Sequence, residues 1–214
     1  MDIELHHFFI LVEPGAEVAE HLRSIGMCEG TRNTHAGQGT ANRRFNCSNG
    51  TLELLWVRDE EESVNGPGRD MCLAERAKDN NASPFGVVFN RKDGESRGMP
   101  FDGWKYQPVY FQPPWAFHIG ANSKNVVEPL CVYMPFIEPG MSKGADENPI
   151  FKAVTEVTVH TPSEGMSEVL KTVNAADRLS IVNAGEHLME VTFNGNQMNR
   201  SHDFRPDIPL VVKW

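Results

Sequence analysis

The sequence predicts an α+β fold in which a strand–helix–strand–strand unit occurs twice, with further strands between the two copies. The first observation is that short runs rich in Val, Ile and Phe outnumber the segments with helical periodicity. The second is that residues 3–12 and residues 154–160 are similar strand-like runs, each followed by a proline and then an amphipathic segment. The third is the offset between those prolines, Pro14 and Pro162, which are 148 residues apart and indicate an internal repeat.

The first unit consists of five segments. Residues 3–12 form an apolar strand, and residues 16–25 predict a helix because apolar side chains recur on one face and a glycine follows directly. Residues 29–39 are polar and rich in glycine, which is typical of a loop. Residues 42–47 and 52–57 are joined by Ser-Asn-Gly, so they predict a hairpin.

The middle of the chain predicts a short helix at residues 70–78 and more strands. These strands are expected at residues 84–90, 109–119 and 130–136. Residues 138–148 combine proline, glycine and charged side chains, so they predict a linker.

The last unit repeats the order of the first. A strand at residues 154–160 is followed by a helix across residues 166–173, and strands are expected at residues 179–182, 188–193 and 209–214. We therefore expect a first module, a middle segment with extra strands, and a second module. Their boundaries are residues 1–60, 61–148 and 149–214.

Composition excludes several classes of partner. Asp and Glu (29) outnumber Lys and Arg (20), and no dense basic cluster is present to neutralise phosphates, so nucleic acid is not an expected partner. No apolar run reaches the roughly 20 residues that cross a bilayer, and the first residues lack the pattern of a signal peptide. We therefore expect a cytoplasmic protein that does not bind membranes. The four cysteines have no metal-binding spacing and predict reduced thiols.

Glu53 is the most informative residue in the sequence. It lies in a strand that is apolar on both faces, where an ionised carboxylate loses its hydration unless a cation, a proton or hydrogen-bond donors compensate. The opening strand offers His6 and His7, and because neighbouring strand residues point to opposite faces, only one of them can face Glu53. Three readings follow: a ligand pair for a divalent metal, a metal-free hydrogen-bonded pair, or a general base with a raised pKa.

Three motifs carry a resemblance to a known family. They are Leu5-His6-His7, then the loop His35-Ala36-Gly37-Gln38-Gly39-Thr40-Ala41-Asn42, then Gly50-Thr51-Leu52-Glu53-Leu54. In this order they resemble the first module of glyoxalase-like proteins in the vicinal oxygen chelate superfamily. That superfamily includes glyoxalase I, extradiol dioxygenases and bleomycin-resistance proteins.

The resemblance implies two βαβββ-type modules whose mixed sheets form an incomplete barrel around a metal and a substrate. It makes His7 and Glu53 metal ligands, with Glu53 also the catalytic candidate, and it places Glu156 at the matching position of the second module. Val211 falls where a second glutamate would be, so a four-ligand site is incomplete, and His118 is the remaining candidate ligand. Zn, Ni, Mn and Fe suit such ligands about equally.

The resemblance also implies a small-molecule partner. The candidate substrate-binding residues are His35, Asn42, Arg44, Trp104 and Trp115. The first functional hypothesis is a metal-dependent enzyme of lyase, isomerase or dioxygenase type that acts on a small oxygen-rich or carbonyl substrate. The alternative is a non-catalytic binding or sequestering protein of the bleomycin-resistance type. Relatives in this superfamily commonly pair, so a homodimer is a further expectation.

Overall fold

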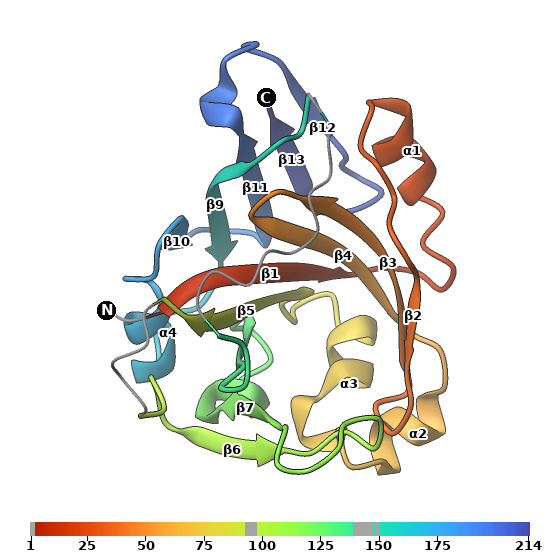
Figure 1. Ribbon diagram of the computed structural model, residues 1–214, viewed down its shortest axis with the longest axis vertical. Helices are drawn as coiled ribbons and strands as arrows, with labels where there is room; N and C mark the ends of the chain where they lie inside the picture. The colour runs from red at the N-terminus through yellow and green to blue at the C-terminus, as the bar shows by residue number, and fades with distance from the viewer. Residues whose placement is uncertain (1–2, 93–97, 139–147, 149) are drawn as a thin grey trace.

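Two mixed β-sheets stacked on each other form the body of the protein (Figure 1). The computed structural model describes residues 3–92, 98–138, 148 and 150–214. The first sheet has eight strands in the order β2-β3-β4-β1-β5-β8-β7-β6, and the second has five in the order β10-β9-β11-β13-β12. The predicted α+β class is confirmed.

The first half of the eight-stranded sheet is a βαβββ module, as predicted. It contains β1 (Ile3–Leu11), α1 (Ala19–Ser24), β2 (Asn33–His35), β3 (Thr40–Cys47) and β4 (Gly50–Val57). β1 runs parallel to β4, and β4 pairs antiparallel with β3. The opening and closing strands of the module are therefore neighbours.

The second half of this sheet comes from the middle segment. Its strands are β5 (Phe85–Arg91), β6 (Gly103–Tyr106), β7 (Phe117–Gly120) and β8 (Leu130–Tyr133). β5 is parallel to β8, as β1 is to β4, and β5 pairs antiparallel with β1 at the centre of the sheet. The strands predicted as extra thus complete the first sheet, while the last part of the chain builds its own. Where the domain boundaries fall stays a prediction.

The five-stranded sheet repeats this central pattern on a smaller scale. It is formed by β9 (Val154–Thr161), β10 (Leu179–Asn183), β11 (Leu188–Phe193), β12 (Ser201–Asp203) and β13 (Leu210–Lys213). β9 and β11 are antiparallel, and each has a parallel neighbour, β10 and β13 respectively. The helix α4 (Glu168–Val173) connects β9 to β10, and its N-cap is Ser167, whose hydroxyl accepts from the amide of Leu170.

Alternation along the strands divides the core into two clusters. Phe8, Ile10, Leu52 and Leu54 belong to the larger cluster, which also contains the buried residues of the second sheet. Phe9, Leu11 and Leu55 point the other way, into a smaller cluster on the opposite face of the first sheet. The helices α2 (Glu60–Asn65) and α3 (Leu73–Lys78) lie beside this second face (Figure 1). The smaller cluster is where the candidate site lies.

Some local predictions differ from the structure. Residues 109–119 were expected to be one strand, but only Phe117–Gly120 is β7, and the preceding stretch is a loop with a cis peptide bond between Pro113 and Pro114. Prolines cannot donate to a ladder, which explains the shorter strand. The short strands β2, β6 and β12 were not predicted because each has only three or four residues. The expected linker at residues 138–148 falls largely outside the described residues.

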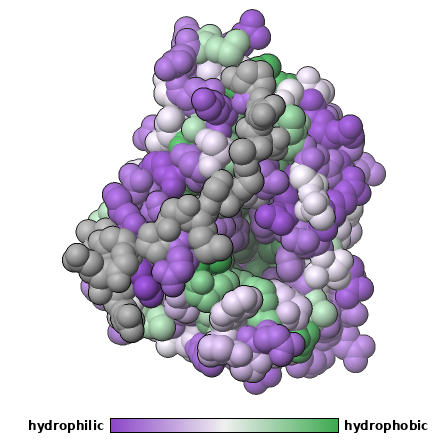
Figure 2. Space-filling view, in the orientation of Figure 1, coloured by the Kyte–Doolittle hydropathy of each residue, from purple (hydrophilic) through white to green (hydrophobic). Residues whose placement is uncertain are grey.

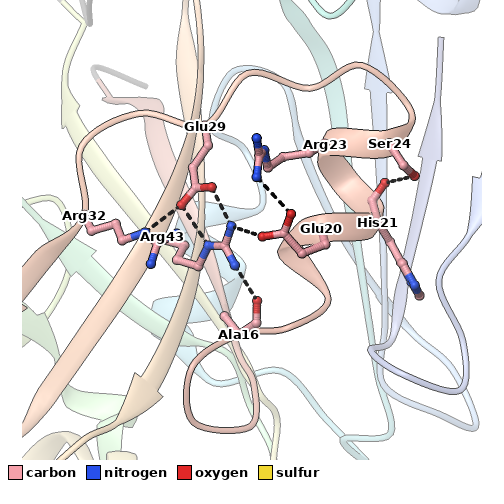
Figure 3. Close-up of polar contacts among 8 residues, drawn as sticks. All are labelled: Ala16, Glu20, His21, Arg23, Ser24, Glu29, Arg32 and Arg43. Carbon is pink, nitrogen blue, oxygen red and sulfur yellow. Dashed lines mark hydrogen bonds and ion pairs between the residues drawn. The ribbon is translucent and has the colours of Figure 1, made fainter.

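A buried arginine attaches the first helix to the first sheet. Arg43 of β3 donates to both carboxylate oxygens of Glu29, and its Nη2 also lies 2.7 Å from Oε1 of Glu20 (Figure 3). The Arg43 guanidinium holds the pKa of Glu29 at about 2. Because side chains alternate along a strand, Arg43 faces α1 while Asn42 and Arg44 point to the other face.

Two sequence expectations concern the chain as a whole. Over the described residues, no helix has the length and apolar character needed to span a membrane. All four cysteines lie within the described residues and none forms a disulfide, in agreement with the prediction of reduced thiols.

Candidate functional site

A β-bulge brings His7 to the face of the sheet that carries Glu53. The pairing of β1 with β5 shifts between Leu5 and His7, so Leu5 and Phe8 both face the larger cluster although they are three residues apart. His7 and Phe9 consequently point to the opposite face, where Phe9 is the neighbour of Glu53 on β4. His7 and Glu53 line the same pocket.

The bulge also changes what was expected of His6. Strict alternation predicted that neighbouring histidines point apart, but Nδ1 of His6 lies 2.8 Å from Nδ1 of His7 and their rings meet edge to face. One of the two nitrogens must carry the proton and the other accept it. His6 therefore acts on the orientation of His7, although it does not itself line the pocket.

Two side chains of β3 hold the carboxylate of Glu53. Asn42 donates from Nδ2 to Oε2 at 2.9 Å, and its own Oδ1 accepts from the amide of Asn33, which fixes the direction of the Asn42 amide. Nε of Arg44 lies 3.5 Å from Oε1. The Glu53 side chain is only 13% exposed, and this burial raises its pKa despite the opposing effects of Arg44 and Asn42. Glu53 is thus an acid held in place but costly to ionise.

His35, at the end of β2, also lines the pocket. Its Nδ1 is 3.0 Å from the hydroxyl of Thr40, and its ring lies beside that of Tyr110. Burial, with the nearby charge of Arg44, lowers the pKa of His35 to about 4. The imidazole is therefore neutral at pH 7 and able to accept as well as donate a hydrogen bond.

The pocket itself is small and mainly apolar, with a volume of about 80 Å³. Its polar lining consists of His7, His35, Gln38, Glu53, Tyr106 and Tyr110, and its apolar lining of Phe9, Leu55, Met71, Leu73, Val88, Phe117, Ile119, Leu130 and Val132. Figure 2, drawn in the orientation of Figure 1, shows a hollow near the centre of the visible surface, with residues coloured hydrophobic on its lower side. A ligand of only a few atoms fits a space about half of the roughly 150 Å³ that holds benzene in an engineered cavity.

Tyr106 lines the pocket, although the aromatic residues predicted to bind substrate were Trp104 and Trp115. It lies on β6, is 2% exposed and lines the pocket, whereas its neighbour two positions earlier, Trp104, packs against the same cluster and donates from Nε1 to Ser123. Trp104 and Tyr106 are two positions apart on one strand, and this spacing is the sequence signal that they share a face of the sheet. Trp115 is 55% exposed and contacts Phe111 and Phe136, outside the pocket lining.

The residues predicted as metal ligands are not all brought together. His118 lies on β7 beside Ile119, which lines the pocket, so its own side chain points away and its Nε2 lies 2.8 Å from the carbonyl of Phe101. Glu156 is exposed on β9 of the other sheet, beside Arg178 and Lys213. Only His7 and Glu53 of the four share a pocket.

In the second half of the first sheet, strands β5 to β8, apolar side chains occupy the positions where further metal ligands would be needed. Val88 of β5 lies opposite His7, and Val132 of β8 is the parallel neighbour of Val88. The sequence analysis aligned Val211 with Glu53, but Val211 lies on β13 of the second sheet and Glu53 on β4 of the first. Within the described part of the chain, no three His, Cys, Asp or Glu side chains converge as a metal site requires. The donors that the described residues bring together therefore do not fit a bound metal ion.

Comparisons with known proteins identify the fold. No family model and no curated protein matches this sequence. A hypothetical protein from Staphylococcus aureus is similar in structure over 99% of this chain and 98% of its own, with 9% sequence identity and a TM-score of 0.56. A variant of 4-hydroxymandelate synthase from Streptomyces coelicolor covers 99% of this chain and 62% of its own at 12% identity, with a TM-score of 0.45. A methylmalonyl-CoA epimerase in complex with methylmalonyl-CoA covers 65% and 99% at 12% identity, with a TM-score of 0.39.

Proposed function

We propose that this chain, which has the fold of the vicinal oxygen chelate superfamily, takes a proton from a small carbonyl-bearing molecule with Glu53 as the general base. The observation that supports this is the environment of Glu53. Its carboxylate is mostly buried, oriented by Asn42 and exposed to a small apolar pocket. Because a fold of this kind hosts many activities, the proposal depends on the site and not on the fold.

The chemistry follows from the state of the carboxylate. A base is most effective when its pKa lies near the working pH, and burial moves the pKa of Glu53 upward from the ordinary value of a glutamate. The C–H bond next to the substrate carbonyl breaks, its proton goes to a Glu53 oxygen, and the electron pair is delocalised onto the carbonyl oxygen. Return of the proton to carbon completes an exchange or an isomerisation without any other reactant. No step passes through a metal.

Hydrogen exchange in deuterated water tests this activity directly. Small ketones such as acetone and butan-2-one are incubated with the protein, and loss of the signal of the protons next to the carbonyl is followed by NMR. We expect Glu53→Gln to slow this exchange by about 100-fold or more, since general bases contribute factors of roughly 10² to 10⁴. The matched control is Glu190→Gln, which changes a partly buried acid of the second sheet.

Three results would count against the base. These are exchange no faster than in buffer with the wild-type protein, equal exchange with Glu53→Gln, and equal loss in both variants. Elemental analysis before and after EDTA accompanies the assay. A stoichiometric divalent ion that is lost in Glu53→Gln would instead favour the metal-dependent enzyme implied by the resemblance.

A second candidate function is binding without catalysis, as in bleomycin-resistance proteins. The apolar half of the pocket, with Val88, Leu130 and Val132, favours it because it contributes area for binding but no reactive group. Binding of a ketone by the wild-type protein without any accelerated exchange would support this candidate. A homodimer and a cytoplasmic location stay predictions.

A further inference from the structure

We infer that Tyr106 donates a hydrogen bond to an oxygen atom of an uncharged small molecule in the pocket, and so selects a carbonyl compound over a hydrocarbon of the same shape. This inference rests on the pocket and the ligand class proposed above, but not on the transfer of a proton. It assigns a specificity-determining role to a residue of the second half of the sheet.

The phenol of Tyr106 is buried without a partner. The residue is 2% exposed and lines the pocket, and its hydroxyl oxygen has no hydrogen-bond partner among the described residues. Nearly all buried polar groups in proteins are hydrogen-bonded, so an unpaired buried hydroxyl on a residue that lines a pocket calls for an explanation. One explanation is a bound ligand that accepts a hydrogen bond from the phenol.

The ring of Tyr106 is held from two sides. It stacks on Phe117 with an interplanar angle of 15° and a centroid distance of 6.2 Å, and it meets Trp104 edge to face at 6.3 Å. These contacts restrict the position of the hydroxyl before any ligand arrives. Preorganised groups of this kind lose little entropy on binding, so their hydrogen bonds discriminate well between ligands.

The protonation state makes Tyr106 a donor. Burial raises its pKa to about 12, so the phenol keeps its proton at neutral pH. Glu53, also in the lining, is an acceptor once it is ionised. The two groups therefore suit different ends of one molecule: Tyr106 an oxygen acceptor, and Glu53 the acidic hydrogen next to it.

Charge and size restrict the ligand further. No Lys or Arg is among the described residues that line the pocket, and Arg44 is next to the Glu53 carboxylate. An anionic ligand would thus enter an apolar space beside an acid without a cation of its own, which is unfavourable. The volume of about 80 Å³ limits the ligand to a few non-hydrogen atoms. Small uncharged ketones and aldehydes meet these conditions.

A pair of probes of equal shape tests the inference. Butan-2-one carries a carbonyl oxygen where 2-methylbut-1-ene carries a CH₂ group, and binding of each is measured by ligand-observed NMR titration. We expect the wild-type protein to bind the ketone about five- to tenfold more tightly, as sites built for a polar group reject analogues that lack it. Tyr106→Phe should remove this preference. Tyr133→Phe, which changes a buried tyrosine outside the pocket lining, should keep it.

Thermal unfolding of the empty proteins provides a second readout. If the Tyr106 hydroxyl has no partner in the protein, Tyr106→Phe removes an unpaired buried polar group and leaves the Tm unchanged or higher. A lower Tm would indicate an internal hydrogen bond and would overturn the inference. So would a Tyr106→Phe protein that still prefers the ketone, or a wild-type protein that does not prefer it.

Failure of the two proposals can be told apart. Glu53→Gln should retain the preference for the ketone while losing hydrogen exchange, and Tyr106→Phe should lose the preference. If the ketone is preferred but no exchange occurs, only the general base is wrong. If exchange occurs without any effect of Tyr106→Phe on the preference, only the role of Tyr106 is wrong.

Discussion

The two halves of the eight-stranded sheet have the same topology but opposite chemistry on the pocket face. In residues 3–57 the closing strand β4 presents Glu53, and the opening strand β1 presents His7. In residues 85–133 the corresponding strands β8 and β5 present Val132 and Val88. Both halves join their opening and closing strands in parallel, so backbone arrangement alone does not explain the difference.

The comparison shows that polar groups are placed where neighbouring strands can satisfy them. Glu53 is accompanied by Asn42 and Arg44 from β3, the strand that pairs with β4. In the second half, β7 pairs with β8 and contributes Ile119 at the pocket, which has no hydrogen-bonding group. An acid at position 132 would therefore lack a side-chain donor from the neighbouring strand β7. The carboxylate and the imidazoles of the pocket therefore come from the first half of the sheet, while the strands of the second half supply the phenol of Tyr106 and hydrocarbon.

The strongest test is to place an acid in the apolar half. Val132→Glu puts a carboxylate at a site that is 7% exposed, with no cation beside it among the lining residues. We expect it to lower the free energy of unfolding by about 3–5 kcal/mol, since a buried unpaired charge is this costly. Urea denaturation at pH 7.5 measures it, with Val132→Leu as the control for shape. A loss below that of Val132→Leu would mean that the second half is well hydrated.

Making the two halves alike sharpens the comparison. In the double variant Val88→His, Val132→Glu the pocket would hold three imidazoles and two carboxylates, a donor set suited to zinc. We expect zinc to stabilise this variant by about 4 kcal/mol when it is present at roughly 1,000 times its Kd, and to leave the wild type nearly unchanged. Thermal unfolding with zinc and with EDTA measures both. An equal response of the wild type would show that His7 and Glu53 suffice for a metal.

Acid stability tests the polar half through His35. Its pKa of about 4 in the folded protein lies below the ordinary value of 6.5, so the unfolded chain binds the proton first. Stability should fall as the pH drops from 6.5 to 4, by up to about 3 kcal/mol from this residue. His35→Gln should show a correspondingly smaller fall in urea titrations over this range. His202→Gln, at an exposed site on β12, serves as the control and should follow the wild type.

The smallest expected effect concerns Glu53 itself. Burial raises its pKa above the value of 4.5, so the folded protein releases this proton at higher pH than the unfolded chain does. The contribution of Glu53 to stability should therefore fall as the pH rises above 4.5. Glu53→Gln should therefore become more stable relative to the wild type as the pH rises from 5 to 8. A difference that is constant with pH would mean that Asn42 and Arg44 offset the burial fully.

Local patterns were sufficient to predict much of the fold and the centre of the site. The strand periods of residues 3–12 and 52–57 identified β1 and β4, and the position of an acid within an apolar strand was enough to single out Glu53. The contact of Arg44 with Glu53 is consistent with alternation along β3, where Arg43 points to the opposite face. These features depend on neighbours a few residues apart, which is the range over which sequence periodicity is informative.

Tertiary structure alone decided which strands share a sheet and which side chains share a pocket. The internal repeat led to the prediction that Glu156 belongs to the site. In the structure β1 pairs with β5, and Glu156 lies in the other sheet, because long-range packing selects which strands share a sheet. The bulge before His7, which depends on that same pairing, set the face on which the imidazole lies. The sequence by itself determined that a buried acid at position 53 needs polar partners. The packing of distant strands determined that those partners are Asn42 and Arg44, and that the rest of the pocket is mainly apolar.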